Sequence, residues 1–137
     1  MDFDFSEEQK AFEKEVVAFL DANDDPDVFD VTRENMAQIV DTPKRRAFMK
    51  KLGHKGWLGM TWPKEYGGSE GEGVYEYILN EALAGRGGPQ IGKGVGIIGK
   101  TVIAHGPENL RQEFCLLYTS PSPRDCGPDL VCRLLLE

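Results

Sequence analysis

The residues whose types and spacing most resemble a chemical site lie between Gly94 and Thr101. Gly94, Gly99, Lys100 and Thr101 fit the pattern G-x-x-x-x-G-K-[ST]. In that pattern backbone amides cradle phosphate groups, the lysine reaches them and the hydroxyl binds magnesium. Gly94, Gly96 and Gly99 also fit the dinucleotide-binding pattern G-x-G-x-x-G. Each pattern indicates a nucleotide site only where a buried strand precedes it and a full helix follows it.

The surrounding sequence favours a different interpretation. The preceding residues, AGRGGPQIGK, cannot form an apolar core strand, and only residues 102–105 separate Thr101 from Gly106 and Pro107. The competing interpretation is a helix whose glycines allow close approach by a neighbouring segment or a ligand. We keep a P-loop nucleotide-binding protein as an alternative function because the motif itself is complete. A small helical interaction module is a second alternative.

Other residues with potential chemistry have structural interpretations. His54 and His105 lie far apart with no cysteine or carboxylate cluster at metal-ligand spacing, so we expect surface or capping roles and assign no metal. We expect three aromatic residues to pack in a core rather than to stack on a ligand: Trp57, Trp62 and Tyr66.

The end of the chain resembles a translated DNA adapter. From Cys115, the residues CLLYTSPSPRD back-translate without a gap into the DNA of a transposase-type sequencing-library adapter, and DLVCRLLL resembles that adapter's outer end. A natural Pro/Ser linker followed by a short apolar segment is the alternative. We expect residues 115–137 to be an artefactual tail, and therefore interpret residues 1–114 alone. All three cysteines lie in the tail, so their number says nothing about disulfides or metal.

Composition excludes several classes of function. Residues 1–114 contain 14 basic and 20 acidic residues, which disfavours a nucleic-acid-binding surface. No apolar run is long enough to span a bilayer, and the acidic start lacks the features of a signal peptide. Residues 44–55 contain six Lys or Arg and no acid, which we interpret as a solvated helix face.

The clearest predicted element is a helix near the start of the chain. Ser6 and Gln9 form a capping box, in which two side chains satisfy opposing backbone amides. Apolar side chains then recur at helical spacing: Phe12, Val16, Phe19 and Leu20. We predict a helix up to about residue 23, followed by a polar loop over residues 24–30.

A second helix is predicted near Thr42, with Pro43 in its first turn and Gly53 at its end. It would turn three side chains toward a core: Ala47, Phe48 and Leu52. A short helical turn is predicted over residues 35–40. Residues 56–68 are too rich in glycine and aromatic residues for a helix, and predict a structured loop anchored by its aromatic side chains.

A third helix is indicated by apolar spacing and is closed by the glycines at 85–88. Its apolar positions are Tyr75, Ile78, Leu79, Ala82 and Leu83. Residues 92–105 have helical spacing but several glycines, each of which disfavours a helix by about 1 kcal/mol relative to alanine. Residues 108–114 look like the opening of another helix.

Four segments taken together resemble the amino-terminal helical domain of the acyl-CoA dehydrogenases. They occur in that family's order and cover nearly all of residues 1–114: DFSEEQKAFEKEVVAFL, KLGHKGWLGMTWPKEYGG, ILNEALAGRGGP and GVGIIGKTVIAHGPENLRQEF. The resemblance implies an all-α fold, a truncated bundle of about four to five helices over residues 1–114. The expected artefactual tail over residues 115–137 lies outside that domain.

The resemblance also implies an activity. Members of that family are FAD-dependent oxidoreductases that remove hydrogen from the α and β carbons of an acyl-CoA thioester and pass electrons to an electron-transfer flavoprotein. Their catalytic glutamate and flavin-contacting segments would lie beyond Phe114, so we assign no catalytic or cofactor-binding residue and expect this chain to be inactive alone. The complete enzyme is expected to be a homo-oligomer in a bacterial cytoplasm or the mitochondrial matrix.

What this chain contributes, by the resemblance, is part of the wall of the acyl-chain pocket. In the family that wall lies against the helix that follows the Gly-Pro turn. The register of the resemblance places four residues nearest the pocket: Gln90, Gly94, Ile97 and Ile98.

Overall fold

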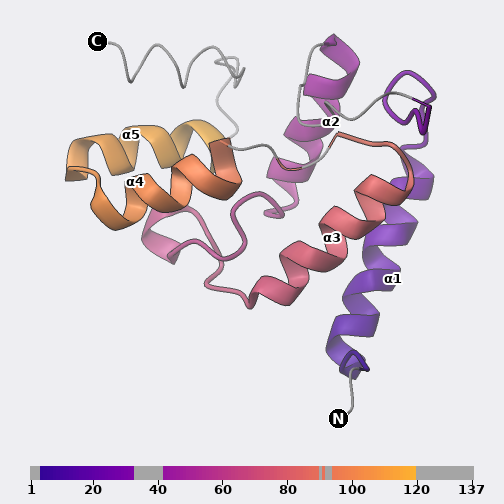
Figure 1. Ribbon diagram of the computed structural model, residues 1–137, viewed down its shortest axis with the longest axis horizontal. Coiled ribbons are helices and arrows are strands. Elements are labelled where there is room, and N and C mark those ends of the chain that lie inside the picture. Colours follow the sequence, from indigo (N-terminus) through magenta and orange to yellow (C-terminus); the bar gives the residue numbers. More distant parts are fainter. Residues whose placement is uncertain (1–3, 33–41, 90, 92–93, 120–137) are drawn as a thin grey trace.

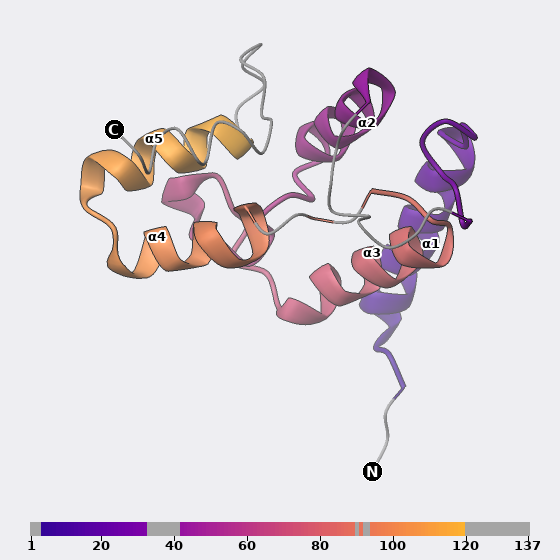
Figure 2. The ribbon, with the colours of Figure 1, turned by 45° about the horizontal axis from the view of Figure 1, so that its top comes forward.

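The computed structural model describes residues 4–32, 42–89, 91 and 94–119, and the regular structure of these residues is entirely helical. The α-helices are α1 (Glu7–Ala22), α2 (Pro43–His54), α3 (Gly73–Gly85), α4 (Lys100–His105) and α5 (Glu108–Thr119). A 3-10 turn, η1 (Lys64–Tyr66), and a π-helical segment, η2 (Gly94–Gly99), complete the described elements. Helix α3 runs beside α1, and α4 and α5 lie side by side (Figures 1 and 2). The predicted all-α fold is confirmed.

Helix α1 begins as the sequence predicts. The Ser6 hydroxyl accepts a hydrogen bond from the Gln9 amide at 3.2 Å, and the Gln9 side chain accepts one from the Ser6 amide at 2.9 Å. Val16 and Leu20 are fully buried, while Phe12 and Phe19 pack at the edge of the same core. A local capping signal and an apolar face therefore determine where this helix lies.

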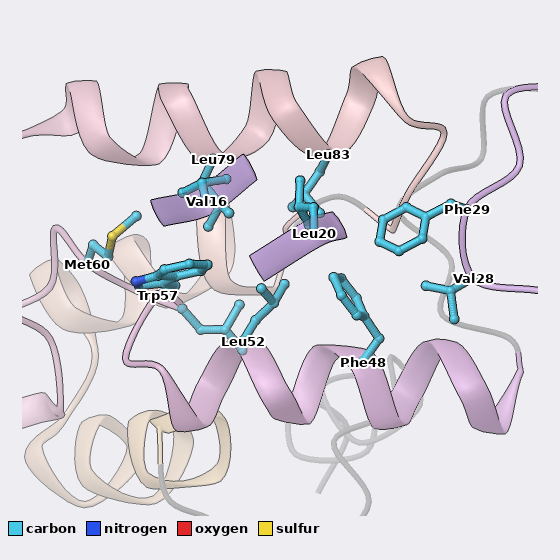
Figure 3. Packing of buried hydrophobic residues seen from close by; sticks show 11 residues of the cluster. Val16, Leu20, Val28, Phe29, Phe48, Leu52, Trp57, Met60, Leu79 and Leu83 are labelled. Carbon is cyan, nitrogen blue, oxygen red and sulfur yellow. The ribbon is translucent and has the colours of Figure 1, made fainter. Parts of the chain in front are cut away.

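The first core cluster fills the space between α1, α2 and α3. Figure 3 shows Val16 and Leu20 of α1 between α3 above and α2 below. The aromatic side chains pack edge to face, with ring centroids 5.1 Å apart for both Phe19–Trp57 and Phe29–Phe48. The remaining members are Val28, Leu52, Leu58, Met60, Leu79 and Leu83.

The second core cluster lies around η2, α4 and α5. Its buried members are Trp62, Tyr66, Val95, Val102 and Phe114. Because Trp57 belongs to the first cluster and Trp62 and Tyr66 to the second, the predicted aromatic loop joins the two cores. That loop and the packing role of its aromatic residues are confirmed.

Helix α2 differs in two details from the prediction. Ala47 is exposed, because the buried face of the helix carries Arg45, Phe48 and Leu52 at three- and four-residue spacing. Gly53 lies inside the helix, which ends at His54, and the left-handed backbone falls at Gly56, where φ is +73°. The glycine that ends the helix is therefore the later of the two.

The loop over residues 24–30 is present but is less polar than predicted. Val28 and Phe29 are buried in the first cluster, although aspartates surround them in the sequence. The predicted turn over residues 35–40 lies outside the described residues. No helix within the described part of the chain is long and apolar enough to cross a membrane.

The basic stretch over residues 44–55 is only partly a solvated face. Arg45 is 1% exposed, and its Nε and Nη2 donate to the carbonyls of Val28 and Gly87, each at 3.2 Å. Lys44 pairs with Asp25 and Asp27, and Lys55 pairs with Glu15 at 3.0 Å, so these cations face the acidic first part of the chain: Glu15, Asp25 and Asp27. The prediction was wrong for Arg45, which fixes the loop before α2 to the turn after α3.

Candidate functional site

The segment with nucleotide-binding spacing is helical. Residues Gly94–Gly99 form η2, which continues directly into the six-residue helix α4. Where the structure describes the chain, no strand precedes this segment, and α4 ends at His105. The strand and long helix that a P-loop requires are therefore not found in the described residues.

Gly99 is in close contact with the ring of Trp62. A Cβ atom at residue 99 would lie 2.3 Å from Cζ2 and 2.9 Å from Cη2 of that ring, a separation that real Cβ atoms do not reach. A Cβ atom at Gly59 would lie 2.8 Å from Cδ2 of the same ring. Trp62 is only 1% exposed. The sequence-based interpretation of a glycine that permits close approach by a neighbour is confirmed at Gly99.

Lys100 is held by a carboxylate from α3. Its Nζ lies 3.0 Å from Oε2 of Glu76, whose Oε1 accepts hydrogen bonds from Oγ1 of Thr61 at 2.8 Å and from the Thr61 amide at 3.3 Å. Burial alone would raise the pKa of the Glu76 carboxyl, but hydrogen bonds from Thr61 and Lys100 outweigh burial and hold this pKa below its ordinary value. The carboxylate is therefore charged and joins three segments.

Thr101 also has a partner inside the chain, because its Oγ1 donates to the carbonyl of Ile97 at 3.0 Å. Three of the four residues that fit the P-loop pattern thus have structural partners: Trp62 for Gly99, Glu76 for Lys100 and Ile97 for Thr101. The match to the P-loop pattern is explained by packing.

The four residues predicted to lie near an acyl-chain pocket fall in different environments. Gln90 lies outside the described residues, and Gly94 begins η2. Ile98 packs against the second cluster, whereas the side chain of its neighbour Ile97 is 62% exposed. Of the described three, Ile97 is the large side chain that is available to a ligand, and Ile98 supports the segment from the core side.

Both histidines are exposed, His54 in the last turn of α2 and His105 in the last turn of α4, where a partial positive charge is favourable. Among the described residues, no group of three or more His, Cys, Asp or Glu could hold a metal ion.

Sequence reasoning missed the arrangement that holds Gly99 and Lys100. Thr61 lies 15 residues before Glu76, and Glu76 lies 24 residues before Lys100. No short-range pattern links such positions. The available signal was the placement of glycines on both sides of Trp62, which suits a large ring that needs close backbone neighbours.

The fold and this segment define an all-helical domain built on two apolar clusters. Residues 6–119 match the family described as acyl-CoA dehydrogenase, N-terminal domain. The chain therefore belongs to the acyl-CoA dehydrogenase family, a class of oxidoreductases, as its sequence motifs predict.

Several relatives illustrate this membership. Acyl-CoA dehydrogenase FadE29 of Mycobacterium tuberculosis is 28% identical over 143 residues, which cover 96% of this chain and 35% of that protein. Mitochondrial isovaleryl-CoA dehydrogenase of Pongo abelii is 38% identical over 74 residues, covering 54% of this chain and 16% of the relative. The solved structure of the Tcur3481-Tcur3483 steroid ACAD has a TM-score of 0.72 at 27% identity, covering 88% of this chain and 31% of that chain. The chain thus spans about a third or less of the length of these relatives.

Proposed function

We propose that the complete protein is an FAD-dependent acyl-CoA dehydrogenase, and that this chain supplies its amino-terminal helical part. Its reaction is the α,β-dehydrogenation of an acyl-CoA thioester, for which bound FAD supplies the hydride-accepting chemistry. The family match over residues 6–119 supports this assignment. In the complete enzyme, which we propose is a homo-oligomer of the bacterial cytoplasm or mitochondrial matrix, electrons pass to an electron-transfer flavoprotein.

The exposed side chain of Ile97 carries the proposed role of this chain. It belongs to a glycine-rich segment whose other large side chains, Val95 and Ile98, pack inward. An isoleucine presented outward from a well-supported segment can contact an apolar acyl chain and keep water away from it. We propose that Gln90, Gly94 and Ile97 form this part of the pocket wall, with Ile98 behind them.

The described residues do not fit a flavin site. The polar side chains nearest to η2 are engaged within the chain, Lys100 and Thr61 with Glu76, and Thr101 with the Ile97 carbonyl. We therefore assign none of them to a pyrophosphate, and we derive no chemical step through them. Stabilisation of the thioester carbonyl and removal of the α-proton belong to residues beyond Phe114 in our proposal.

The proposal is tested with the complete protein expressed from its source locus. An acyl-CoA series should bleach the flavin absorbance of that protein, and Ile97→Ala should change which acyl chain is preferred. Val31→Ala is the matched control, because Val31 is 74% exposed on the loop before α2. If no acyl-CoA bleached the flavin, the proposed activity would be wrong. If the two variants preferred the same acyl chain, Ile97 would not form part of the pocket wall.

The same locus tests the origin of residues 115–137. We propose that the natural sequence after Phe114 completes a helix and enters a β domain. Genomic DNA that itself encodes CLLYTSPSPRD after Phe114 would show that the tail is natural. The 137-residue chain alone should neither bind FAD tightly nor reduce it with an acyl-CoA.

A further inference from the structure

We infer that Thr61 and Trp62 act as positioning residues that hold the junction of η2 and α4, and that this junction sets the depth of the acyl-chain pocket. The five residues Thr61, Trp62, Glu76, Gly99 and Lys100 are called the junction clamp. The inference rests on the proposed function, because it concerns the position of the wall that Ile97 forms.

In the clamp, the neighbours Thr61 and Trp62 hold the neighbours Gly99 and Lys100. Trp62 contacts Gly99 directly, and Thr61 holds Lys100 through the Glu76 carboxylate. One contact is steric and the other is a charged hydrogen-bond network. Together they fix the junction where the π-helical segment passes into α4.

The segment needs such a support because its own backbone is weakly determined. Gly94, Gly96 and Gly99 contribute no side chains, and glycine has more conformational freedom than any other residue. A Cβ atom at Gly96 would have no neighbour within 4 Å. The π-helix is also a rare conformation that occurs mostly as a single turn, often at functional sites. The location of Ile97 therefore depends on the anchored end of the segment.

The direction of the expected effect follows from the two sides of the segment. Trp62 lies buried on the core side and Ile97 is exposed on the other. Ordinary contact begins at 3.4 Å, so with a methyl group 2.3 Å from the ring either Trp62 or η2 must shift. Because the Trp62 ring is 1% exposed and also lies close to Gly59, we expect η2 to move away from it. That movement pushes Ile97 outward and makes the pocket shallower.

The experiment uses the complete enzyme with short and long acyl-CoA substrates. Gly99→Ala should raise the KM for the long substrate by about tenfold, the size of effect that one methylene has in an apolar pocket, while kcat for the short substrate is largely kept. Gly85→Ala is the matched control, because residue 85 ends α3 and an added Cβ meets nothing within 4 Å. The double variant Trp62→Phe with Gly99→Ala should restore the lower KM for the long substrate, because a smaller ring leaves room for the methyl group.

A second variant covers the polar half of the clamp and the case in which Gly99→Ala does not fold. Thr61→Val keeps the shape of the side chain and removes the hydroxyl hydrogen bond to Glu76, while the bond from the backbone amide remains. It should also shift the preference toward short substrates. An active wild-type enzyme in which both variants keep the wild-type ratio of KM values would overturn the inference. A wild-type enzyme that reduces flavin with no acyl-CoA would instead overturn the proposed function.

Discussion

Gly99 and Trp62 meet so closely that a methyl group on the glycine would stand 2.3 Å from Cζ2 of the indole ring. The ring belongs to the loop that joins the two apolar clusters, since Trp57 and Met60 lie in one cluster and Trp62 and Tyr66 in the other. The contact therefore connects the position of η2 to the whole helical core.

Gly99→Ala should destabilise the chain. Alanine favours a helix by about 1 kcal/mol over glycine, but forcing a methyl group into a packed site costs about 1–3 kcal/mol or more when the neighbour cannot move. Gly96→Ala, in the same segment but facing open space, should instead raise the free energy of unfolding. Urea denaturation of the two variants measures the difference, and a loss of stability in both would point to the π-helix itself rather than to Trp62.

Acid should weaken the fold through Glu76. Burial raises the pKa of this carboxyl, but the hydrogen bonds from Thr61 and Lys100 prevail and keep the pKa below its ordinary value of 4.5. A carboxyl with a lower pKa in the folded than in the unfolded chain stabilises the fold above the unfolded value, and that stability is lost as the pH falls through the folded value.

The free energy of unfolding should therefore decrease as the pH is lowered below about 4.5. Glu76→Gln should remove part of that decrease. Glu81→Gln makes the same change of charge at an exposed position of α3 and is the control. Denaturant titrations at several pH values give the comparison. An equal loss of acid sensitivity in both variants would contradict the role of Glu76.

Magnesium ATP should leave the thermal midpoint of the chain unchanged, because Lys100 and Thr101 are engaged within the structure. Lys100→Met should lower the stability by about 0.5–1 kcal/mol, the range of a partly exposed ion pair. The exposed Lys64, whose Nζ is 3.9 Å from Glu70, is the control, and Lys64→Met should change little. A midpoint that rises with ATP and no longer does so in Lys100→Met would restore the P-loop alternative.

Local signals made much of the helical architecture predictable. The Ser6–Gln9 capping box and the apolar spacing in α1 and α3 act over three or four residues, and the structure confirms them. The burial of Val28 and Phe29 was not predicted, because it depends on contacts with residues distant in the sequence. The ring of Phe29 packs on Phe48 at 5.1 Å, and no neighbouring residue in its acidic stretch indicates that contact.

The candidate site shows the same division between local and distant information. The glycines of η2 and the lysine at its end were recognisable from spacing, but their partners Thr61, Trp62 and Glu76 come from a loop and from another helix. A pattern of residue types cannot distinguish a glycine that approaches a phosphate from one that approaches an indole ring. The distinction came from the flanking sequence, which has no apolar strand before Gly94 and no room for a full helix after Thr101.

Arg45 provides a test of a buried cation. Its side chain donates to the carbonyls of Val28 and Gly87, and Gly87 also accepts from the Asp30 amide at 3.1 Å. Arg45→Met removes these donors from the carbonyl oxygens of Val28 and Gly87. That loss should lower the free energy of unfolding by about 2–4 kcal/mol. Lys50→Met, at an exposed position of the same helix, should change it by less than about 0.5 kcal/mol. Similar losses in both variants, measured by urea denaturation, would show that the carbonyl contacts carry little stability.

Glu70 provides the converse test, in which a substitution should stabilise the chain. Its φ is +54°, a left-handed conformation held because its amide donates to the Trp62 carbonyl at 2.9 Å and the Gly71 amide donates to the Met60 carbonyl at 2.9 Å. That conformation costs a residue with a side chain about 1–2 kcal/mol, and glycine offsets about 0.4–1 kcal/mol of the gain through its freer unfolded state.

Glu70→Gly should therefore raise the free energy of unfolding by about 0.8 kcal/mol, the difference between the midpoints of those two ranges. Glu70→Gln is the matched control, because it removes the charge and the weak pairing with Lys64 but keeps the side chain in the left-handed conformation. Denaturation midpoints of the two variants separate backbone strain from charge. If the glutamine variant were as stabilised as the glycine variant, the gain would come from the lost charge, and the turn that supports Trp62 would be unstrained.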